Sequence, residues 1–384
     1  MKLLLLAPHP FYQNRGTPIA VRLLASTLGR HGYEIDLLTF HEGAAVELSN
    51  CRIIRTRTLS WITNIKPGFS FKKIACDVLL FFKTVSLLRQ NRYDAIHAVE
   101  EAVFIARFMR LWFGVPYIYD MDSSLAEQLL EKYPLLQPLG VILRFFEQGA
   151  VKKSSGVIAV CRILEERARQ LAPGKPVLRL EDVPMVREEP AAGEVLREKY
   201  AITGPIIMYV GNLEHYQGMD LLLNSLQIVA VSHPEASLVV IGGSSADISA
   251  SAGFAAKLGI GQRVHFIGPR PLGQLFAYLV QADILVSPRS KGINTPMKIY
   301  SYLDSGVPVL ATDLPTHTQV LDDQIALLVA AEPVAMAAGL ARLLADSRLR
   351  TDLARRARQR VSREYSREAY EKKLCAFYDG LALD

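Results

Sequence analysis

Residues 284–311 read ILVSPRSKGINTPMKIYSYLDSGVPVLA. A short apolar run opens this stretch, a polar loop follows, and an amphipathic segment leads through Gly306 to a second apolar run. A strand, a helix and a second strand in this order form a βαβ unit, whose two strands lie parallel in one sheet. Gly306 suits the end of the helix, because glycine readily adopts the left-handed conformation found there. The stretch therefore predicts an α/β protein.

The same alternation of apolar strands and helical segments runs along the whole chain. In the first half it predicts strands at residues 2–7, 34–40, 52–57, 95–98, 116–119, 156–160 and 177–181. After a polar linker at 188–193, it predicts strands at 206–210, 237–241, 263–267, 284–286 and 307–311. We therefore predict two Rossmann-like domains, at residues 1–185 and 186–384. Residues 333 to about 381 have a helical pattern, and we expect the last helix, at about 366–381, to pack back on the first domain.

Composition excludes several classes of protein. The chain has 384 residues, 50% of them hydrophobic, which excludes a disordered chain. Its four cysteines, Cys51, Cys76, Cys161 and Cys375, are too far apart in sequence for a zinc site or a disulfide framework and fit a reducing cytosol. The apolar start ends at Pro8, short of a signal peptide or a membrane span. We expect a cytoplasmic protein.

The net charge of +6 calls for an explanation. Basic residues gather between residues 52 and 92, with aromatic and aliphatic residues between them: Arg52, Arg55, Arg57, Lys66, Lys72, Lys73, Lys83, Arg89 and Arg92, with Trp61, Ile62, Phe69, Phe71, Leu79, Leu80, Phe81 and Phe82. Such a segment can bind anionic lipid at the inner face of the cell membrane, or be a half-buried helix with a solvated face. No recognition motif accompanies the charge, so nucleic acid is not expected as a partner.

Two loops that follow predicted strands have the glycines of an anion site. In open parallel sheets, ligands bind beyond the carboxyl ends of the strands, where helix N-termini offer free amides. In the first loop, Gly16 would let backbone approach a ligand and Thr17 would cap a helix that begins at Pro18. In the second, residues 211–218, Gly211 ends a strand and Gly218 opens a helix. Each loop could equally be an ordinary connection between a strand and a helix.

The loop at residues 287–298 carries the strongest signal. It contains three cations, Arg289, Lys291 and Lys298, and we expect Asn294 or Thr295 to cap the helix that follows. Cations and a helix N-terminus on one loop suit the diphosphate of a nucleotide leaving group. The alternative is that Arg289 and Lys291 are solvated loop charges.

Taken together, these loops resemble those of the family-four retaining glycosyltransferases with the GT-B fold. The resemblance covers essentially the whole chain and rests on the first glycine loop, the Gly211 and Gly218 segment, the strand end at 264–269, and the block from Pro296 through Ser301 to residues 306–309. It implies two Rossmann-like domains facing across a cleft, and a metal-independent, retaining transfer from a nucleotide sugar to a saccharide or lipid-linked acceptor. Glycan or polysaccharide biosynthesis is the implied setting, with no cofactor beyond the donor.

The resemblance also assigns residues to the donor, with departures. The family's arginine and lysine of the glycine segment are here Asn212 and Gln217, and its two glutamates are Ile293 and Ser301. Ser301 would still bond a ribose hydroxyl, and backbone at Pro269 and Arg270 would hold the base. Our hypothesis is that the three cations of the 287–298 loop replace the missing positive charge.

Asp122 is the candidate residue on the catalytic face of the first domain. It follows a predicted strand, at the position where the family often places a histidine or an acid, and would orient the acceptor hydroxyl. The alternative is that Asp122 or a neighbouring serine caps a helix whose first turn holds Glu127. Asp120 and Asp122 form an Asp-x-Asp pair, but no cluster has metal-ligand spacing, so no metal site is expected.

Two other functions remain open. The missing glutamates and charges fit a non-catalytic protein that kept the GT-B fold to bind a nucleotide sugar or glycan. A sugar-nucleotide epimerase of the same architecture would need acid and base groups beside the donor sugar, and Ile293 provides none.

Overall fold

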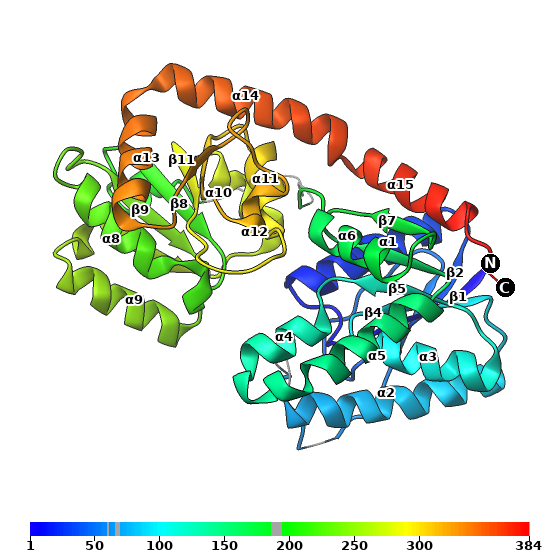
Figure 1. Ribbon diagram of the computed structural model, residues 1–384. Helices are drawn as coiled ribbons and strands as arrows, with labels where there is room; N and C mark the ends of the chain where they lie inside the picture. The colour runs from blue at the N-terminus through cyan, green and yellow to red at the C-terminus, as the bar shows by residue number, and fades with distance from the viewer. Residues whose placement is uncertain (60, 66–69, 186–193, 384) are drawn as a thin grey trace. The chain divides into compact units, whose positions relative to one another are not determined.

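The computed structural model describes all residues except 60, 66–69, 186–193 and 384. The predicted linker at 188–193, and Lys66 and Phe69 of the basic segment, lie outside the described residues. The chain forms two compact units (Figure 1). The first contains residues up to Glu181 and those from Tyr370 onward, and the second extends from Asp182 to Ala369.

The first unit is built on a seven-stranded sheet of order β3-β2-β1-β4-β5-β6-β7. All its described strand pairings are parallel. The sheet is buried, which explains why β1 is a continuous apolar run rather than an alternating one. Its strands are β1 (Lys2–Ala7), β2 (Glu34–Thr39), β3 (Cys51–Arg55), β4 (Ala95–Val99), β5 (Tyr117–Met121), β6 (Gly156–Ala159) and β7 (Val177–Arg179).

Helices connect these strands and supply the remaining core. Buried side chains of α2 and α3, such as Leu80 and Val103, pack against those of the sheet, such as Leu4 and Leu6. The helices of this unit are α1 (Gly16–Arg30), α2 (Phe71–Gln90), α3 (Ala102–Phe113), α4 (Leu125–Lys132), a 3₁₀ turn η1 (Pro134–Leu139), α5 (Gly140–Lys153), α6 (Arg162–Leu171) and α15 (Arg367–Asp379). Within the described ranges, none of the chain's helices is both long and apolar enough to span a bilayer.

The second unit repeats the plan with a six-stranded parallel sheet of order β10-β9-β8-β11-β12-β13. The strands are β8 (Ile206–Val210), β9 (Ser237–Ile241), β10 (Val264–Gly268), β11 (Ile284–Ser287), β12 (Val309–Thr312) and β13 (Leu327–Val329). The α-helices are α7 (Leu196–Lys199), α8 (Met219–Val229), α9 (Ser245–Lys257), α10 (Leu275–Leu279), α11 (Lys298–Asp304), α12 (Pro315–Thr318), α13 (Pro333–Ala345) and α14 (Ser347–Glu364). Short 3₁₀ turns lie at η2 (His215–Gln217), η3 (Gly261–Arg263) and η4 (Leu272–Gln274). The two sheets confirm the predicted fold class.

The C-terminal segment, for which the sequence predicts a helical pattern, consists of three helices, α13, α14 and α15. Asp346 ends α13 and caps α14, where its side chain accepts a hydrogen bond from the amide of Leu349. Most of the third helix, α15, is part of the first unit and is held there by side-chain contacts. Lys373 bonds Glu181, Glu371 pairs with Arg30, and the Tyr378 hydroxyl lies 2.6 Å from Nδ1 of His97.

Both sheets reverse their strand order at one point, between β1 and β4 in the first and between β8 and β11 in the second. At such a point the two neighbouring connections leave on opposite faces of the sheet, which opens a crevice beyond the carboxyl ends of the strands. Of the predicted donor residues, most follow β8 or β11. The fold therefore brings the second and third loops of the sequence together.

Candidate donor site

The loops that follow β8 and β11 contact each other through a glycine. Gly218 has φ +77°, and a Cβ there would lie 1.9 Å from the carbonyl oxygen of Pro288. Beside this contact, the amide of Ser290 donates to the carbonyl of Tyr216 at 2.9 Å. Only glycine permits both the left-handed conformation and this approach. Gly218 thus joins the two loops, in addition to opening helix α8.

Lys298, at the start of α11, is a buried cation in this site. Its ammonium nitrogen lies 3.9 Å from the centre of the Tyr209 ring, and 3.2 Å from where a Cβ of Gly211 would be. Among the described residues no carboxylate pairs with it, and only 8% of the residue is exposed. Burial, with a smaller contribution from Arg289, lowers the pKa of Lys298 well below its ordinary value. A buried ammonium of this kind gains stability from a bound anion.

Arg289 is held by its own loop. One guanidinium nitrogen donates to the carbonyl of Asn294 and to the hydroxyl of Thr316, each at 2.8 Å. The guanidinium also lies 5.0 Å from the centre of the Tyr216 ring. Its Nε and the hydroxyl of Thr295 are both buried without a partner among the described residues. The loop therefore fixes Arg289 and leaves two buried polar groups available for a ligand.

The expected helix cap at Asn294 or Thr295 is wrong. Helix α11 begins at Lys298, its N-cap is Met297, and no side chain caps it. The carbonyl of Asn294 accepts instead from Arg289 and, at 2.6 Å, from Thr316. Because these bonds fix the loop before the helix starts, Asn294 supports Arg289 rather than the helix end.

Asn212, Gln217 and Ser301, which replace charged residues of the family pattern, each make local hydrogen-bond contacts. The hydroxyl of Tyr209 donates to the carbonyl of Asn212 at 2.6 Å and lies 3.5 Å from the amide oxygen of the buried Gln217. Ser301, the candidate ribose partner, accepts from the amide of Met185 at 3.0 Å. Both neutral residues, Gln217 and Ser301, are thus buried in the site.

The remaining positions of the family pattern lie on the loops that follow β10 and β11. Pro269 is exposed and follows Gly268, which has φ +72°, while Arg270 pairs with Glu194 at 3.2 Å. Lys291 is exposed. Ile293 is 39% exposed, at the position where the family has its first glutamate.

Sequence reasoning missed the loop after β12. His317 is fully buried, with Nε2 2.8 Å from the Ser287 hydroxyl and Nδ1 2.9 Å from the carbonyl of Thr312. Burial lowers the pKa of His317 to about 3, so the ring is neutral. It ties the end of β11, and hence the Arg289 loop, to β12. The rule that directed attention to loops beyond strand ends applies to this loop too.

Gly16 and Thr17 lie in the first unit, and the predicted cap is again wrong. Helix α1 begins at Gly16 with Arg15 as its N-cap, and no side-chain bond caps it. Thr17 lies within the helix, where its side chain bonds Glu100. Thr17 therefore connects α1 to the end of β4 instead of capping the helix.

The first unit has an acidic corner beyond β4 and β5. Glu100, with φ +49°, is half-buried, and loss of solvation raises its pKa. Asp120 lies 3.0 Å from Nε2 of His97, whose other nitrogen faces Tyr378. His97 thus links β4 to β5 and to α15. In the described part of the chain, no group of three or more His, Cys, Asp or Glu could hold a metal ion.

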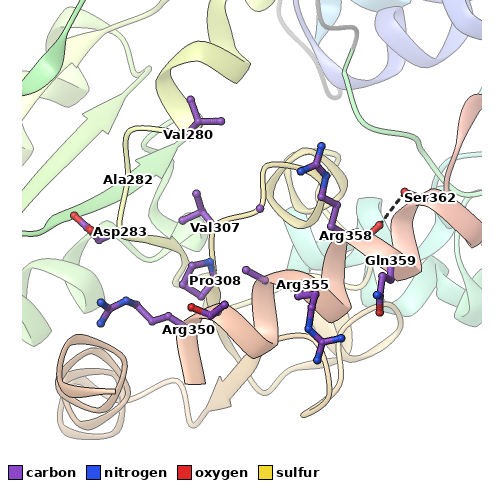
Figure 2. Close-up of a pocket in the computed structure, with 13 residues that line it drawn as sticks. Val280, Ala282, Asp283, Val307, Pro308, Arg350, Arg355, Arg358, Gln359 and Ser362 are labelled. Carbon is purple, nitrogen blue, oxygen red and sulfur yellow. Dashed lines mark hydrogen bonds between the residues drawn. The ribbon is translucent and has the colours of Figure 1, made fainter. Parts of the chain in front are cut away.

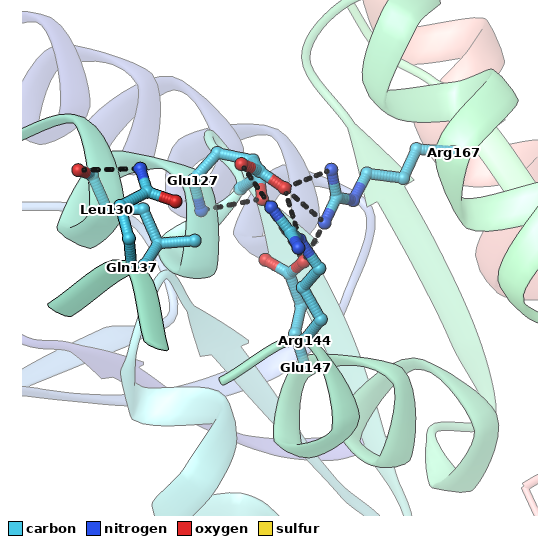
Figure 3. Close-up of polar contacts among 7 residues, drawn as sticks. Glu127, Leu130, Gln137, Arg144, Glu147 and Arg167 are labelled. Carbon is cyan, nitrogen blue, oxygen red and sulfur yellow. Dashed lines mark hydrogen bonds and ion pairs between the residues drawn. The ribbon is translucent and has the colours of Figure 1, made fainter. Parts of the chain in front are cut away.

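Asp122 is half-buried just after β5 and does not cap α4. The cap is Ser124, which accepts from the amide of Glu127 at 3.4 Å. Around it, Glu127 pairs with Arg144 and Arg167, and the buried Glu147 pairs with Arg167 (Figure 3). Ser124 and Glu127 therefore hold the start of α4 through these contacts.

An open pocket of the second unit lies away from these loops. Its volume is about 860 Å³, and its lining includes Asp283, Val307 and Pro308, just before β11 and β12, and Arg355 and Arg358 of α14 (Figure 2). It therefore lies at the amino ends of the strands. The loops described above are at the carboxyl ends, where parallel sheets bind ligands.

Both halves of the chain match glycosyltransferase families. Residues 15–180 match the glycosyl transferase 4-like domain, and residues 194–360 match the glycosyl transferases group 1. One match lies in each structural unit. The chain therefore belongs to the glycosyltransferases with the GT-B fold.

The chain spans about half the length of the curated relatives that it matches. The chain is 29% identical to the D-inositol 3-phosphate glycosyltransferase of Corynebacterium urealyticum over 188 residues, which are 47% of this chain and 44% of that protein. It is 24% identical to the putative glycosyltransferase YtcC of Bacillus subtilis over 202 residues, 50% of this chain and 49% of that protein.

Solved structures match the whole chain in fold. Sucrose-phosphate synthase from Thermosynechococcus elongatus has a TM-score of 0.80 at 21% identity, with 98% of each chain covered. HepE from Anabaena, in complex with UDP and glucose, has a TM-score of 0.77 at 16% identity, covering 99% of this chain and all of that one. At this identity the likeness concerns the fold alone.

Proposed function

We propose that the protein transfers a sugar from a nucleotide-sugar donor to a saccharide or lipid-linked saccharide acceptor, in glycan or polysaccharide biosynthesis. The observation that carries this proposal is the buried ammonium of Lys298 beside Gly211, at the carboxyl ends of β8 and β11. A dianionic diphosphate is the group that such a site stabilises best. We further propose that the reaction is retaining and metal-independent, as the family resemblance implies.

In this proposal, Lys298 and Arg289 stabilise the departing nucleotide. Charge accumulates on the diphosphate as the sugar leaves, and a fixed cation in a site with little water stabilises that charge strongly. Because burial lowers the pKa of Lys298, a bound diphosphate would raise it again. Donor binding would therefore be accompanied by proton uptake at any pH at which Lys298 is neutral in the free enzyme.

The same residues support the hypothesis that positive charge has moved between loops. The family's arginine and lysine of the β8 loop are Asn212 and Gln217 here, yet Lys298 reaches that loop from α11. Lys291 is exposed and does not reach that loop in the described structure, so the hypothesis of relocated charge is limited to Lys298 and Arg289. Asp122 remains our candidate for orienting the acceptor hydroxyl.

The test compares Lys298→Met with wild-type protein by calorimetric titration of uridine and guanosine diphosphates. Methionine keeps the volume but removes the charge, so we expect nucleotide affinity to fall about 100-fold. The fold should be as stable or more stable, because a buried cation without a counter-ion is removed. Lys291→Met is the matched control and should bind as the wild type does. Equal affinity in Lys298→Met would contradict the proposal.

A non-catalytic nucleotide-sugar or glycan-binding protein is the second candidate. It is favoured by one observation, namely that Ile293 and Ser301 stand where the family has glutamates. Slow hydrolysis of a bound nucleotide sugar, abolished in Lys298→Met, would exclude it. Tight donor binding without hydrolysis or transfer would support it.

We also propose a cytoplasmic enzyme that works at the inner face of the cell membrane, where lipid-linked acceptors would be available. The basic and aromatic composition of residues 52–92 supports this location.

A further inference from the structure

Helices α2, α3 and α5 lie side by side on one face of the first unit (Figure 1). Large apolar side chains on all three are exposed: Phe71 is 87% exposed, Phe82 64%, Leu111 74%, Trp112 61%, Val141 77% and Phe145 66%. An exposed apolar surface of this size on a globular protein usually marks an interaction site. We call these three helices and their exposed side chains the α2–α3–α5 face.

The centre of this face is an aromatic cluster shared by two helices. Phe81 of α2 lies 5.9 Å from Trp112 and 6.5 Å from Phe108 of α3, measured between ring centres. Phe82 lies 5.5 Å from Phe81, and Phe108 lies 6.0 Å from Trp112. Because these rings contact one another, the exposed Phe82, Phe108 and Trp112 form one patch that spans α2 and α3.

The α2–α3–α5 face also holds the chain's excess positive charge. The three helices contain nine basic residues, Lys72, Lys73, Lys83, Arg89, Arg107, Arg110, Arg144, Lys152 and Lys153. Against these stand two acids, Asp77 and Glu147, and Glu147 is buried against Arg167. Their net charge is therefore +7, compared with +6 for all 384 residues. The rest of the chain is nearly neutral.

The strand part of the basic segment contributes less than the sequence predicts. Arg52 bonds Asp36, and Arg55 donates to the carbonyls of Gly43 and Ala44. Ile62 is buried, and the buried Lys73 pairs with Glu101. These residues hold the first unit together. The surface left for a partner is displaced toward α3 and α5, which sequence reasoning did not consider.

We propose that the α2–α3–α5 face docks on an anionic lipid bilayer. Aromatic and aliphatic side chains at its centre would enter the boundary between headgroups and acyl chains, and the lysines and arginines around them would contact anionic headgroups. Charge complementarity selects this occupant, because lysines and arginines outnumber acids on these helices even after Lys73 pairs with Glu101 and Arg144 with Glu127, so two copies of the face would repel each other. The face lies on the first unit, apart from the donor-site residues of the second, so its test does not depend on the transfer reaction.

The experiment is co-sedimentation of the full chain with vesicles of phosphatidylcholine alone or mixed with phosphatidylglycerol. We expect binding to the mixed vesicles, weakened by salt, and little binding to the neutral ones. The double variant Phe82→Ser, Trp112→Ser should lose about tenfold in affinity or more. The double variant Lys72→Glu, Lys152→Glu should lose at least about fivefold for each lysine.

The matched control is Val231→Ser, Val334→Ser, which removes two exposed apolar side chains from the second unit. It should bind vesicles as the wild type does. We expect nucleotide affinity, measured by calorimetry, to be unchanged in every variant. That result would show that the loss of vesicle binding does not come from damage to the donor site. Equal binding of wild-type and variant proteins to mixed vesicles would overturn the proposal. A second result would also overturn it: light scattering shows a wild-type dimer that does not bind vesicles, and the double variant Phe82→Ser, Trp112→Ser is a monomer.

Discussion

The two sheets of the molecule have opposite electrostatics at corresponding places. Beyond β8 and β11, the buried ionisable groups are Lys298 and the neutral His317, held near Arg289 and tyrosine rings. Beyond β4, carboxylates predominate: Glu100 and, on α2, Asp77 are half-buried with raised pKa values, beside the buried Lys73. One architecture therefore presents a cationic crevice in one unit and an acidic corner in the other. The side chains, rather than the fold, decide which partner each sheet can hold.

The largest expected effect is that the free energy of unfolding depends on pH differently in the two units. His317 has a folded pKa of about 3 against 6.5 unfolded, so between these values the unfolded state binds more protons. The stability of the second unit should thus rise with pH, by up to about 1.4 kcal/mol per unit, and be lost as pH falls. In the first unit, His9, lowered to about 4, acts in the same direction, but Asp77, raised to about 6, acts in the opposite one.

Urea unfolding at several pH values measures this difference. Both tryptophans, Trp61 and Trp112, lie in the first unit, so fluorescence follows that unit alone while circular dichroism follows both. We expect the steeper slope in the second unit, and a reduced slope in His317→Asn. Equal slopes in the two units, or an unaltered slope in the variant, would contradict the assignment.

The glycine contact between the two donor loops can be broken directly. Gly218→Ala places a Cβ 1.9 Å from the Pro288 carbonyl at φ +77°, so the loops must separate. We expect a loss of about 3 kcal/mol in the unfolding free energy of the second unit. Gly253→Ala, in the open on α9, is the control and should stabilise by about 0.5–1 kcal/mol. If both variants had the same stability, the proposed role of Gly218 would be wrong.

The acidic corner depends on a helix that is remote in sequence. Tyr378→Phe on α15 would leave Nδ1 of the buried His97 without its partner. We expect the first unit to lose about 1–2 kcal/mol, seen by tryptophan fluorescence, with the second unit unaffected. A wild-type fluorescence transition in this variant would show that the bond contributes nothing to stability.

Several parts of the fold could be predicted because they depend on local sequence. Short-range patterns alone predict the strands β1 and β8, which are continuous apolar runs. They also predict the strand end at Gly211 and the helix ends at Gly218 and Gly306. Strand β13 was missed, since its three half-buried residues give a weak signal. The caps predicted at Thr17 and at Asn294 or Thr295 are wrong because α1 begins one residue before Thr17 and α11 begins three residues after Thr295.

The candidate site divides in the same way. The sequence indicated Arg289 and Lys298, because cations beside a helix start are visible in a linear chain. It could not indicate that Lys298 is buried against Tyr209 while Lys291 is exposed, since burial depends on packing between segments nearly ninety residues apart. Nor could it indicate His317, whose partners Ser287 and Thr312 lie on two different strands.

By itself, the sequence determined that this protein has two parallel α/β sheets and which loops lie beyond their strands, because hydrophobic periodicity and glycine conformation act over a few residues. Only the tertiary structure decided which charges are buried, which caps form, and that the exposed aromatic and basic residues gather on α2, α3 and α5. Those outcomes depend on which residues are shielded from solvent by segments distant in the chain. A local sequence pattern contains no information about that shielding.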